Sequence, residues 1–208
     1  MIINSCMLTF KQYITEDASV SSLTIFDIDD TLFRTNTKVL VKKDDKTVRE
    51  LTPAEYNVDK LAPGEEYDYV QFRSSAIFNK TAKPIETVFK TAKKMLAKFA
   101  GYAQKKVTII TARDDFDDKN LFLKTFKKYG FNIDRVYVHR AGKLKMAGPQ
   151  AKAKIARDAL EKGKYTIARM FDDHEGNLDA FLALSKEFSN IKFEAFFVDE
   201  TGNITRYT

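Results

Sequence analysis

The chain has 208 residues, of which 44% are apolar and 31% are charged. This composition suits one globular domain with a sizeable core and excludes a largely disordered protein. A single cysteine, Cys6, excludes an internal disulfide framework and a cysteine-based zinc site, and it indicates a reducing compartment, so we expect a cytoplasmic protein. The net charge of +6 attracts polyanions such as nucleic acid, although a solvated basic surface is the commoner explanation.

The first residues lack the basic start and the long apolar centre of a signal peptide. No apolar run approaches the ~18 residues that a membrane span requires. We therefore expect neither secretion nor a membrane partner. Residues 1–20 are interpreted as an N-terminal extension, in which FKQYITE can form a short amphipathic helix, and residues 21–208 as the domain itself.

The first expected strand covers residues 23–28, and an insertion at about residues 34–83 follows it. The insertion begins with TKVLVKKDDKTVREL, in which two alternating runs around residues 42–46 predict a β-hairpin. The next part, LTPAEYNVDKLAPGEEYDYVQF, is rich in tyrosine and acid and is expected to be irregular. Because it follows the first strand directly, the insertion can cover a site at the end of that strand.

Strand and helix patterns alternate after the insertion. We expect a helix that Pro84 opens and Gly101 closes, and further helices over residues 116–129 and 150–162 and after Gly176. Strands are expected at residues 107–110, 135–138, 166–171 and 191–198. This order predicts an α/β fold with a Rossmann-like central parallel sheet, helices on both faces, and a β-hairpin flap or small cap inserted after the first strand.

Polar motifs follow three of the expected strands. The stretch IFDIDDTLF places Asp27, Asp29 and Asp30 after an apolar run, IITAR ends in Thr111-Ala112-Arg113, and MFDDHEGN contains Asp172-Asp173. A buried carboxylate without a partner costs several kcal/mol, so the first cluster is expected at an exposed strand end, around a cation, or both. The carboxyl ends of parallel strands meet at one edge of the sheet, where ligands bind.

Such a set of residues supports a narrow range of chemistry. Carboxylates from two strand ends suit Mg²⁺, which takes one or two carboxylates together with substrate phosphate. A carboxylate beside that phosphate can attack it and form an aspartyl-phosphate, while a second protonates the leaving oxygen and later activates water. Asp27 and Asp29 are two residues apart, so they point to the same side of an extended chain.

In this order, with a lysine between the last two, IFDIDDTLF, IITAR and MFDDHEGN resemble the haloacid dehalogenase superfamily of phosphohydrolases. The resemblance spans residues 23 to about 197 and depends on the ordered set, because each motif alone is unspecific. It implies a Mg²⁺-dependent phosphatase with a flap and an optional cap directly after the first strand. Asp27 would then be the nucleophile and a metal ligand, and Asp29 the general acid/base that ligates the metal through its backbone carbonyl.

The same resemblance implies roles for the later motifs. Thr111 and Ala112 would hold phosphoryl oxygens, and Asp172 would complete the metal site with Asp173 as a second ligand or an orienting neighbour. Lys152 is preferred as the catalytic and phosphate-binding lysine over Lys154 and Lys145. Its spacing to Ile155 and Leu160, three and eight positions later, resembles the polynucleotide 3'-phosphatase branch.

Each motif also has an ordinary structural explanation. The acidic residues after the first strand, and Asp172-Asp173, can cap turns or helix starts. If every motif were only a cap or a turn, the whole ordered set would have arisen by chance in one chain. The functional interpretation is therefore favoured. Two residues stay open, since Arg113 and Asn177 either support the acidic site or serve as a local turn and cap. His174 is expected at the surface, because Mg²⁺ prefers oxygen ligands.

We expect a Mg²⁺-dependent phosphomonoesterase with an aspartyl-phosphate intermediate. A nucleotide or a nucleic-acid terminal phosphate is the favoured substrate, because a small cap leaves the site open enough for large substrates. Aromatic residues of the insertion can also stack on a base, although packing onto the domain is their commoner use. The alternatives are a small-metabolite phosphatase and a catalytically silent nucleic-acid or protein binding module on the same fold. A phosphotransferase or a dehalogenase is a third hypothesis, and the Asp172-Asp173 pair argues against dehalogenation, which needs no Mg²⁺.

Overall fold

The computed structural model describes residues 20–208, apart from the side chains of residues 54 and 57. The expected extension at residues 1–20 therefore lies outside the described residues, except for its last position. Within the described part, no helix combines the length and the apolar character that a membrane span requires.

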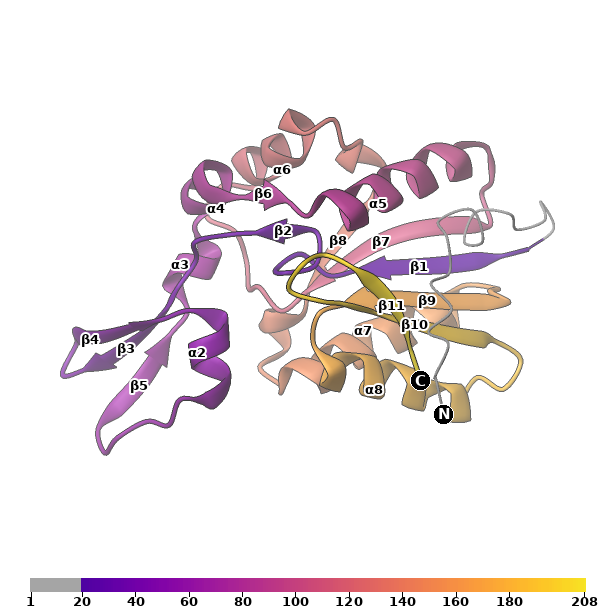
Figure 1. Ribbon diagram of the computed structural model, residues 1–208. Helices are drawn as coiled ribbons and strands as arrows, with labels where there is room; N and C mark the ends of the chain where they lie inside the picture. Colours follow the sequence, from indigo (N-terminus) through magenta and orange to yellow (C-terminus); the bar gives the residue numbers. More distant parts are fainter. Residues whose placement is uncertain (1–19) are drawn as a thin grey trace, which may run out of the picture.

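Among the described residues, a six-stranded sheet forms the centre of the domain (Figure 1). From one edge to the other, its strands are β11 (Ile204–Tyr207), β10 (Lys192–Val198), β9 (Ile167–Asp172), β1 (Ser22–Phe26), β7 (Lys105–Thr111) and β8 (Tyr137–Arg140). Neighbouring strands are parallel except β10 and β11, which are antiparallel. The predicted α/β fold with a central parallel sheet is confirmed, and β11 is an addition that was not predicted.

The central strands are buried on both faces, which explains their continuous apolar runs. Every residue of β1 is buried, and its side chains alternate between two hydrophobic clusters, with Leu23 and Ile25 in one and Phe26 in the other. Phe26 stacks on Phe171 of β9, which stacks in turn on Phe196 of β10, with ring centroids 4.6 Å apart in both pairs. This row of rings holds the carboxyl ends of three strands at the same level.

Helices cover both faces of the sheet (Figure 1). The helices α5 (Glu86–Lys98) and α6 (Lys119–Lys128) lie on one face, and α7 (Gly148–Lys162) and α8 (Glu175–Ala183) lie on the other. The first pair buries Phe89 and Phe126 against the sheet, and the second pair buries Leu160 and Phe181. Short 3-10 turns occur at Phe99–Gly101, Ile133–Arg135, Ala141–Leu144 and Leu184–Lys186.

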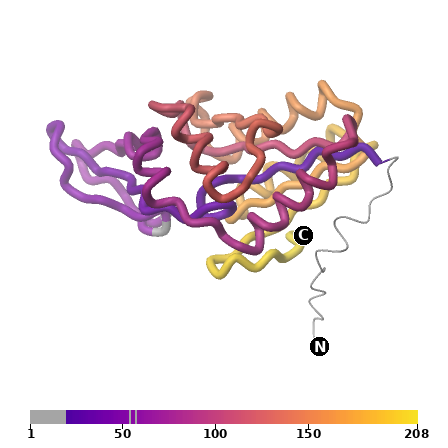
Figure 2. The backbone as a smooth tube through the Cα atoms, turned by 90° about the horizontal axis from the view of Figure 1, so that it is seen from above, coloured from indigo at the N-terminus to yellow at the C-terminus, as the bar shows by residue number. Residues whose placement is uncertain are grey.

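The insertion lies at one end of the molecule (Figure 2). The chain leaves the body through β2 (Phe33–Arg34) and returns through β6 (Lys83–Pro84), and these two short strands pair with each other. Between them lie β3 (Val39–Lys43), β4 (Lys46–Leu51) and β5 (Glu65–Asp68), which form a small antiparallel sheet, and the helices α2 (Pro53–Val58), α3 (Val70–Arg73) and α4 (Ser75–Thr81). The predicted hairpin is confirmed as β3 and β4, joined by Asp44 and Asp45 with φ of 50° and 61°.

The segment after the hairpin was predicted to be irregular, and this prediction is wrong. It contains α2, which begins with a capping box in which the Thr52 hydroxyl accepts from the Glu55 amide and the Glu55 carboxylate accepts from the Thr52 amide. It also contains β5, whose acidic residues pair with the lysine-rich edge of β3. The helix start at α2 could have been predicted from the capping sequence TPAE. The strand β5 could not, because it depends on pairing with β3, more than 20 residues earlier.

Pro84 was predicted to open a helix, and this prediction is wrong. Pro84 pairs with Phe33 in β6, and α5 begins two residues later at Glu86. Proline has no backbone amide to donate, and a short pair of edge strands tolerates this because it does not continue into a larger sheet. The other predicted bounds shift by a few residues, since Asp118 caps α6 with its carboxylate and the 3-10 turn at Ile133–Arg135 delays β8 until Tyr137.

Candidate active site

The polar motifs meet at the carboxyl edge of the central sheet. Asp27 directly follows β1, and Asp172 is the last residue of the neighbouring strand β9. The two strands are in register at Phe26 and Phe171, and the Asp27 amide donates to the Phe171 carbonyl at 3.1 Å. The register of two buried strands therefore places both carboxylates side by side.

A tight turn after β1 places the next polar residues. The amides of Leu32 and Phe33 both donate to the Ile28 carbonyl, at 3.0 and 2.8 Å. Asp30 occupies the left-handed region with φ of 54°, which aspartate tolerates better than most residues. The turn buries Thr31 and brings its hydroxyl to the Asp173 Oδ1 atom at 3.0 Å. IDDT is thus a structural turn that also supports the acidic pair of β9.

Three carboxylates converge at this edge. One oxygen from each of Asp27, Asp172 and Asp173 lies within 4.8 Å of the other two. Burial raises the pKa of Asp27 well above its ordinary value and outweighs the lowering effect of Lys152. Burial, followed by the charge of Asp172, raises the pKa of Asp173 to about 7. The cluster therefore concentrates more negative charge than this environment stabilises.

Lys152 lies between two of these carboxylates. It comes from the start of α7, and its buried Nζ atom lies 2.9 Å from Asp27 Oδ1 and 2.8 Å from Asp172 Oδ2. Burial lowers the pKa of this ammonium, but the charges of Asp172 and Asp27 outweigh burial and raise the pKa above its ordinary value. Lys154 instead pairs with Asp158 on the exposed side of α7, and Lys145 is exposed after a 3-10 turn.

Asp172 is held by further donors. The Asn177 side-chain amide donates to its Oδ1 atom at 2.7 Å, and the His174 amide donates to the same oxygen at 3.1 Å. Of the two explanations for Asn177, support of the acidic loop agrees with this contact. His174 caps α8 with its backbone and is exposed, as was expected.

The end of β7 contributes a turn next to the acidic cluster. Thr111 is fully buried, and its hydroxyl accepts from the Arg113 amide at 3.2 Å. Ala112 is exposed and lines the cleft described below, whereas Thr111 is not among the lining residues. Gly142 lies against this turn so closely that an added Cβ would stand 2.6 Å from the Ala112 carbonyl oxygen. In this structure the expected phosphate-binding hydroxyl of Thr111 is used within its own turn.

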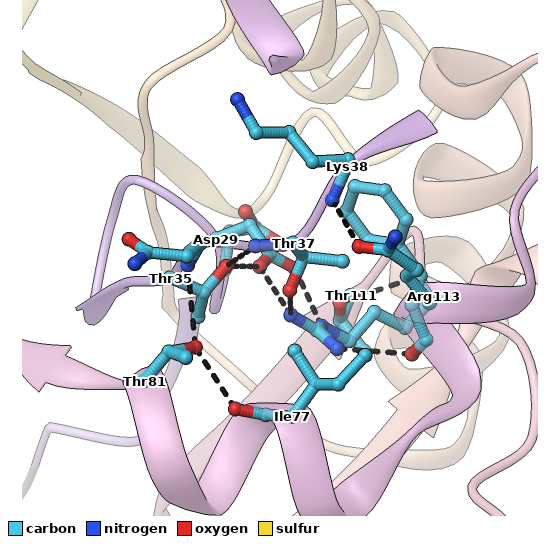
Figure 3. Close-up of polar contacts among 12 residues, drawn as sticks. Asp29, Thr35, Thr37, Lys38, Ile77, Thr81, Thr111 and Arg113 are labelled. Carbon is cyan, nitrogen blue, oxygen red and sulfur yellow. Dashed lines mark hydrogen bonds and ion pairs between the residues drawn. The ribbon is translucent and has the colours of Figure 1, made fainter. Parts of the chain in front are cut away.

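Asp29 is not part of the carboxylate trio, and its side chain points toward Arg113 (Figure 3). Its two oxygens accept from Arg113 Nε at 2.8 Å and from Arg113 Nη2 at 2.6 Å. This two-pronged contact joins residues that are 84 positions apart in the chain. The sequence left the role of Arg113 open, and only the tertiary structure identifies Asp29 as its partner.

A cleft of about 930 Å³ extends from the acidic cluster to the insertion. Asp27, Lys152 and Asp173 line its inner part, and Tyr56, Tyr67, Tyr69 and Phe72 of the insertion line its outer part. The hydroxyls of Tyr56 and Tyr69 are hydrogen-bonded at 2.8 Å. Acidic residues outnumber basic ones seven to three among the residues that line the cleft.

The carboxylate trio fits a hard divalent cation. Its donors are all oxygens, the preferred ligands of Mg²⁺. Asp27 Oδ1 is buried and has no hydrogen bond, because its contact with Lys152 is an ion pair without hydrogen-bond geometry. One oxygen from each of Asp27, Asp172 and Asp173 could hold a cation, which would also offset the negative charge that, after burial, raises the pKa of Asp27 and of Asp173.

Chemically, the cleft combines three carboxylates that could hold a cation, a buried ammonium and a partly exposed carboxylate. Such a set can neutralise a phosphoryl group, provide a carboxylate to attack it, and supply a second carboxyl for proton transfer.

Comparisons with known proteins give little sequence evidence. No protein-family model matches the chain, and no curated protein matches it. Among solved structures, the HAD domain of the effector protein Lem4 from Legionella pneumophila is similar, with 12% sequence identity and a TM-score of 0.48. The similarity covers 87% of this chain and 88% of that domain.

Proposed function

We propose that this protein is a phosphohydrolase of the haloacid dehalogenase superfamily, which hydrolyses phosphomonoesters through an aspartyl-phosphate with Mg²⁺ as cofactor. The observation that carries this proposal is the position of Lys152, whose ammonium lies within 3 Å of both Asp27 and Asp172 at the edge where the three strand-end motifs meet. An ordinary set of helix caps would not need a buried lysine. A phosphoryl group does need one beside its nucleophile.

Each step has a residue to perform it. The Asp27 carboxylate attacks phosphorus, the bond from phosphorus to the leaving oxygen breaks, and the Asp29 carboxyl gives its proton to that oxygen. Asp29 then takes a proton from water, the water oxygen attacks phosphorus, and the bond to Asp27 breaks, which releases phosphate. Lys152 and the turn at Ala112 hold the phosphoryl oxygens. Mg²⁺, held by Asp27, Asp172, Asp173 and the backbone of Asp29, would neutralise charge on the phosphoryl group.

We propose a free nucleotide as the substrate. The tyrosines in the outer cleft support this choice, because aromatic side chains stack on bases for ~1–3 kcal/mol each. A nucleic-acid terminal phosphate uses the same features, but the acidic lining repels an extended polyanion. A small-metabolite phosphate is the second candidate, because it brings less negative charge past this acidic lining than a nucleic acid does.

Phosphate release from a panel of substrates tests this proposal. The panel contains 5'- and 3'-mononucleotides, oligonucleotides phosphorylated at either end, a sugar phosphate and an aryl phosphate, each with and without Mg²⁺. We expect turnover that requires Mg²⁺, is fastest on mononucleotides and is abolished by Asp27→Asn. Asp158→Asn is the matched control, because it removes an exposed carboxylate on α7 that pairs with Lys154.

Two outcomes would contradict the proposal. Turnover that survives Asp27→Asn would exclude this carboxylate as the nucleophile. Absence of turnover on the whole panel, with the folded protein binding Mg²⁺, would favour a catalytically silent binding module. Preference for the sugar phosphate would replace the nucleotide by a metabolite and leave the mechanism in place.

A further inference from the structure

The Arg113 side chain is buried even more deeply than those of Lys152 and Asp27, which line the same cleft. This side chain is 1% exposed, whereas the side chain of its partner Asp29 is 22% exposed. The guanidinium carbon lies 5.2 Å from the ring centroid of Phe72 and 4.9 Å from that of Phe78. A charge buried in this way needs strong partners, because its desolvation costs several kcal/mol.

The donors of Arg113 go to three separate segments (Figure 3). Nε and Nη2 bind the Asp29 carboxylate, Nη2 also donates to the Thr37 hydroxyl at 3.3 Å, and Nη1 donates to the Phe72 carbonyl at 2.9 Å. Thr37 lies where the chain enters the small sheet of the insertion, just before β3, and Phe72 lies in α3 where the chain leaves it. One side chain therefore holds both crossings of the insertion and the carboxylate of Asp29.

Further contacts tighten the same junction. The Lys38 amide donates to the Gln71 side-chain carbonyl at 2.9 Å, which ties the two crossings to each other. The Thr35 hydroxyl donates to Asp29 Oδ1 at 3.5 Å, and the Thr37 amide donates to the Thr35 hydroxyl at 3.4 Å. A change in the angle between the insertion and the body would therefore stretch or break these contacts.

We propose that Arg113 is a positioning residue that fixes the orientation of the Asp29 carboxylate and links it to the position of the insertion. This inference deepens the proposed function, because it assumes that Asp29 gives a proton to the leaving group and later takes one from water. The planar guanidinium fork matches both carboxylate oxygens at once, which a lysine ammonium cannot do. The position of the insertion, which Arg113 contacts at Thr37 and Phe72, then influences the geometry of proton transfer.

The Arg113→Lys variant distinguishes a positioning role from simple stabilisation of the fold. In a positioning role, the loss of rate depends on whether the leaving group needs a proton. An alkyl leaving group, such as the 5'-oxygen of a nucleotide, needs a proton as its bond to phosphorus breaks, so kcat falls on the order of 100-fold when the acid is misplaced. A nitrophenolate leaves without a proton, so the burst of nitrophenolate that accompanies aspartyl-phosphate formation keeps its rate. Steady-state turnover of the aryl substrate still falls, because Asp29 activates the water of the second step.

Arg169→Lys provides a matched control. Arg169 is also a buried arginine, and its Nε atom lies 2.7 Å from the Glu194 carboxylate on the neighbouring strand β10. Any loss in this variant comes from altered packing of the sheet, so it should affect alkyl and aryl substrates to the same degree. If the nitrophenolate burst in Arg113→Lys slows by the same factor as kcat on the alkyl substrate, the positioning role is overturned.

A second measurement tests the link without relying on activity. Asp29→Asn removes the ion pair with Arg113. Arg113 also donates to the Phe72 carbonyl, so the loss of the ion pair should weaken the hold on the insertion. We expect amide hydrogen exchange at residues 70–74 to accelerate at least several-fold in Asp29→Asn and in Arg113→Lys, and to stay unchanged in Arg169→Lys. Unchanged exchange in both of the first two variants would overturn the link between Asp29 and the insertion.

The two measurements also separate this inference from the proposed function. If the wild-type protein releases phosphate from no substrate, the proposed function falls, and hydrogen exchange still decides whether Arg113 joins Asp29 to the insertion. If the wild type is active and exchange is unchanged in the variants, the proposed function stands and the inference falls.

Discussion

Asp173→Asn is expected to stabilise the metal-free protein at neutral and alkaline pH. The carboxyl of Asp173 lies half-buried beside Asp172, and burial followed by that charge raises its pKa to about 7 from the ordinary 3.8. The folded protein therefore binds this proton more tightly than the unfolded chain does. Stability is lost as the pH rises from about 3.8 to about 7, and the full cost is present above that range.

The size of the effect follows from the two pKa values. One pKa unit corresponds to about 1.4 kcal/mol, so ionised Asp173 costs at most roughly 4 kcal/mol at pH 8 and about 1.6 kcal/mol at pH 5. Asparagine removes the charge and keeps an oxygen that can accept from the Thr31 hydroxyl, which donates to Asp173 at 3.0 Å. The stability gain of the variant should therefore grow with pH.

Urea unfolding at pH 5 and pH 8, in the presence of a chelator, measures this gain. Asp199→Asn is the control of opposite sign, because the Thr201 hydroxyl and the Asn203 amide lower the pKa of Asp199 to about 2, so its ionised form is favoured in the folded state. We expect that variant to lose stability. If Asp173→Asn is no more stable than the wild type at pH 8, the carboxylate cluster is not electrostatically crowded and the reasoning is wrong.

Three further predictions concern the same edge of the sheet. Lys152→Met should lower the free energy of unfolding by about 3 kcal/mol in urea titrations without metal, because Asp27 and Asp172 lose their shared ammonium; unchanged stability would contradict that reasoning. Gly142→Ala should cost about 1–3 kcal/mol and raise KM, because its Cβ would lie 2.6 Å from the Ala112 carbonyl oxygen; an unaltered KM would show that the β7 turn does not hold the phosphate. Millimolar Mg²⁺ should raise the Tm of the wild type and leave that of Asp172→Asn unchanged, as thermal scans can show; equal shifts in both would place the cation elsewhere.

The parallel sheet and the position of its acidic edge were predictable from local patterns. The strands β1, β7 and β9 are apolar runs that end in polar motifs, so these motifs were expected at one edge of the sheet, whereas the structure supplies the strand order that places Asp27 beside Asp172. The structure places Lys152 between the two carboxylates, whereas Lys154 pairs with Asp158. The hairpin of the insertion was also visible as two alternating runs around a short polar turn.

Contacts between distant residues were not predictable in this way. The pairing of Arg113 with Asp29 spans 84 positions, and the hydrogen bond from Thr31 to Asp173 spans 142, so no local pattern indicates either. Pro84 matched a helix start by residue type, yet the partner Phe33 draws it into a strand. In each case a tertiary contact decides the outcome, and local propensity is only a weak guide to it.

Trapping of the covalent intermediate tests the central claim most directly. Asp29→Asn lacks the base for the second step, so a substrate with a good leaving group, such as an aryl phosphate, should load its Asp27 and leave the phosphoryl group there. Acid quenching followed by borohydride reduction converts an aspartyl-phosphate into homoserine, which peptide mass spectrometry can locate. We predict homoserine at position 27, dependent on both substrate and Mg²⁺. Phosphate release by the wild type with no modified residue at position 27 in the variant, or with the modification at another carboxylate, would contradict the account.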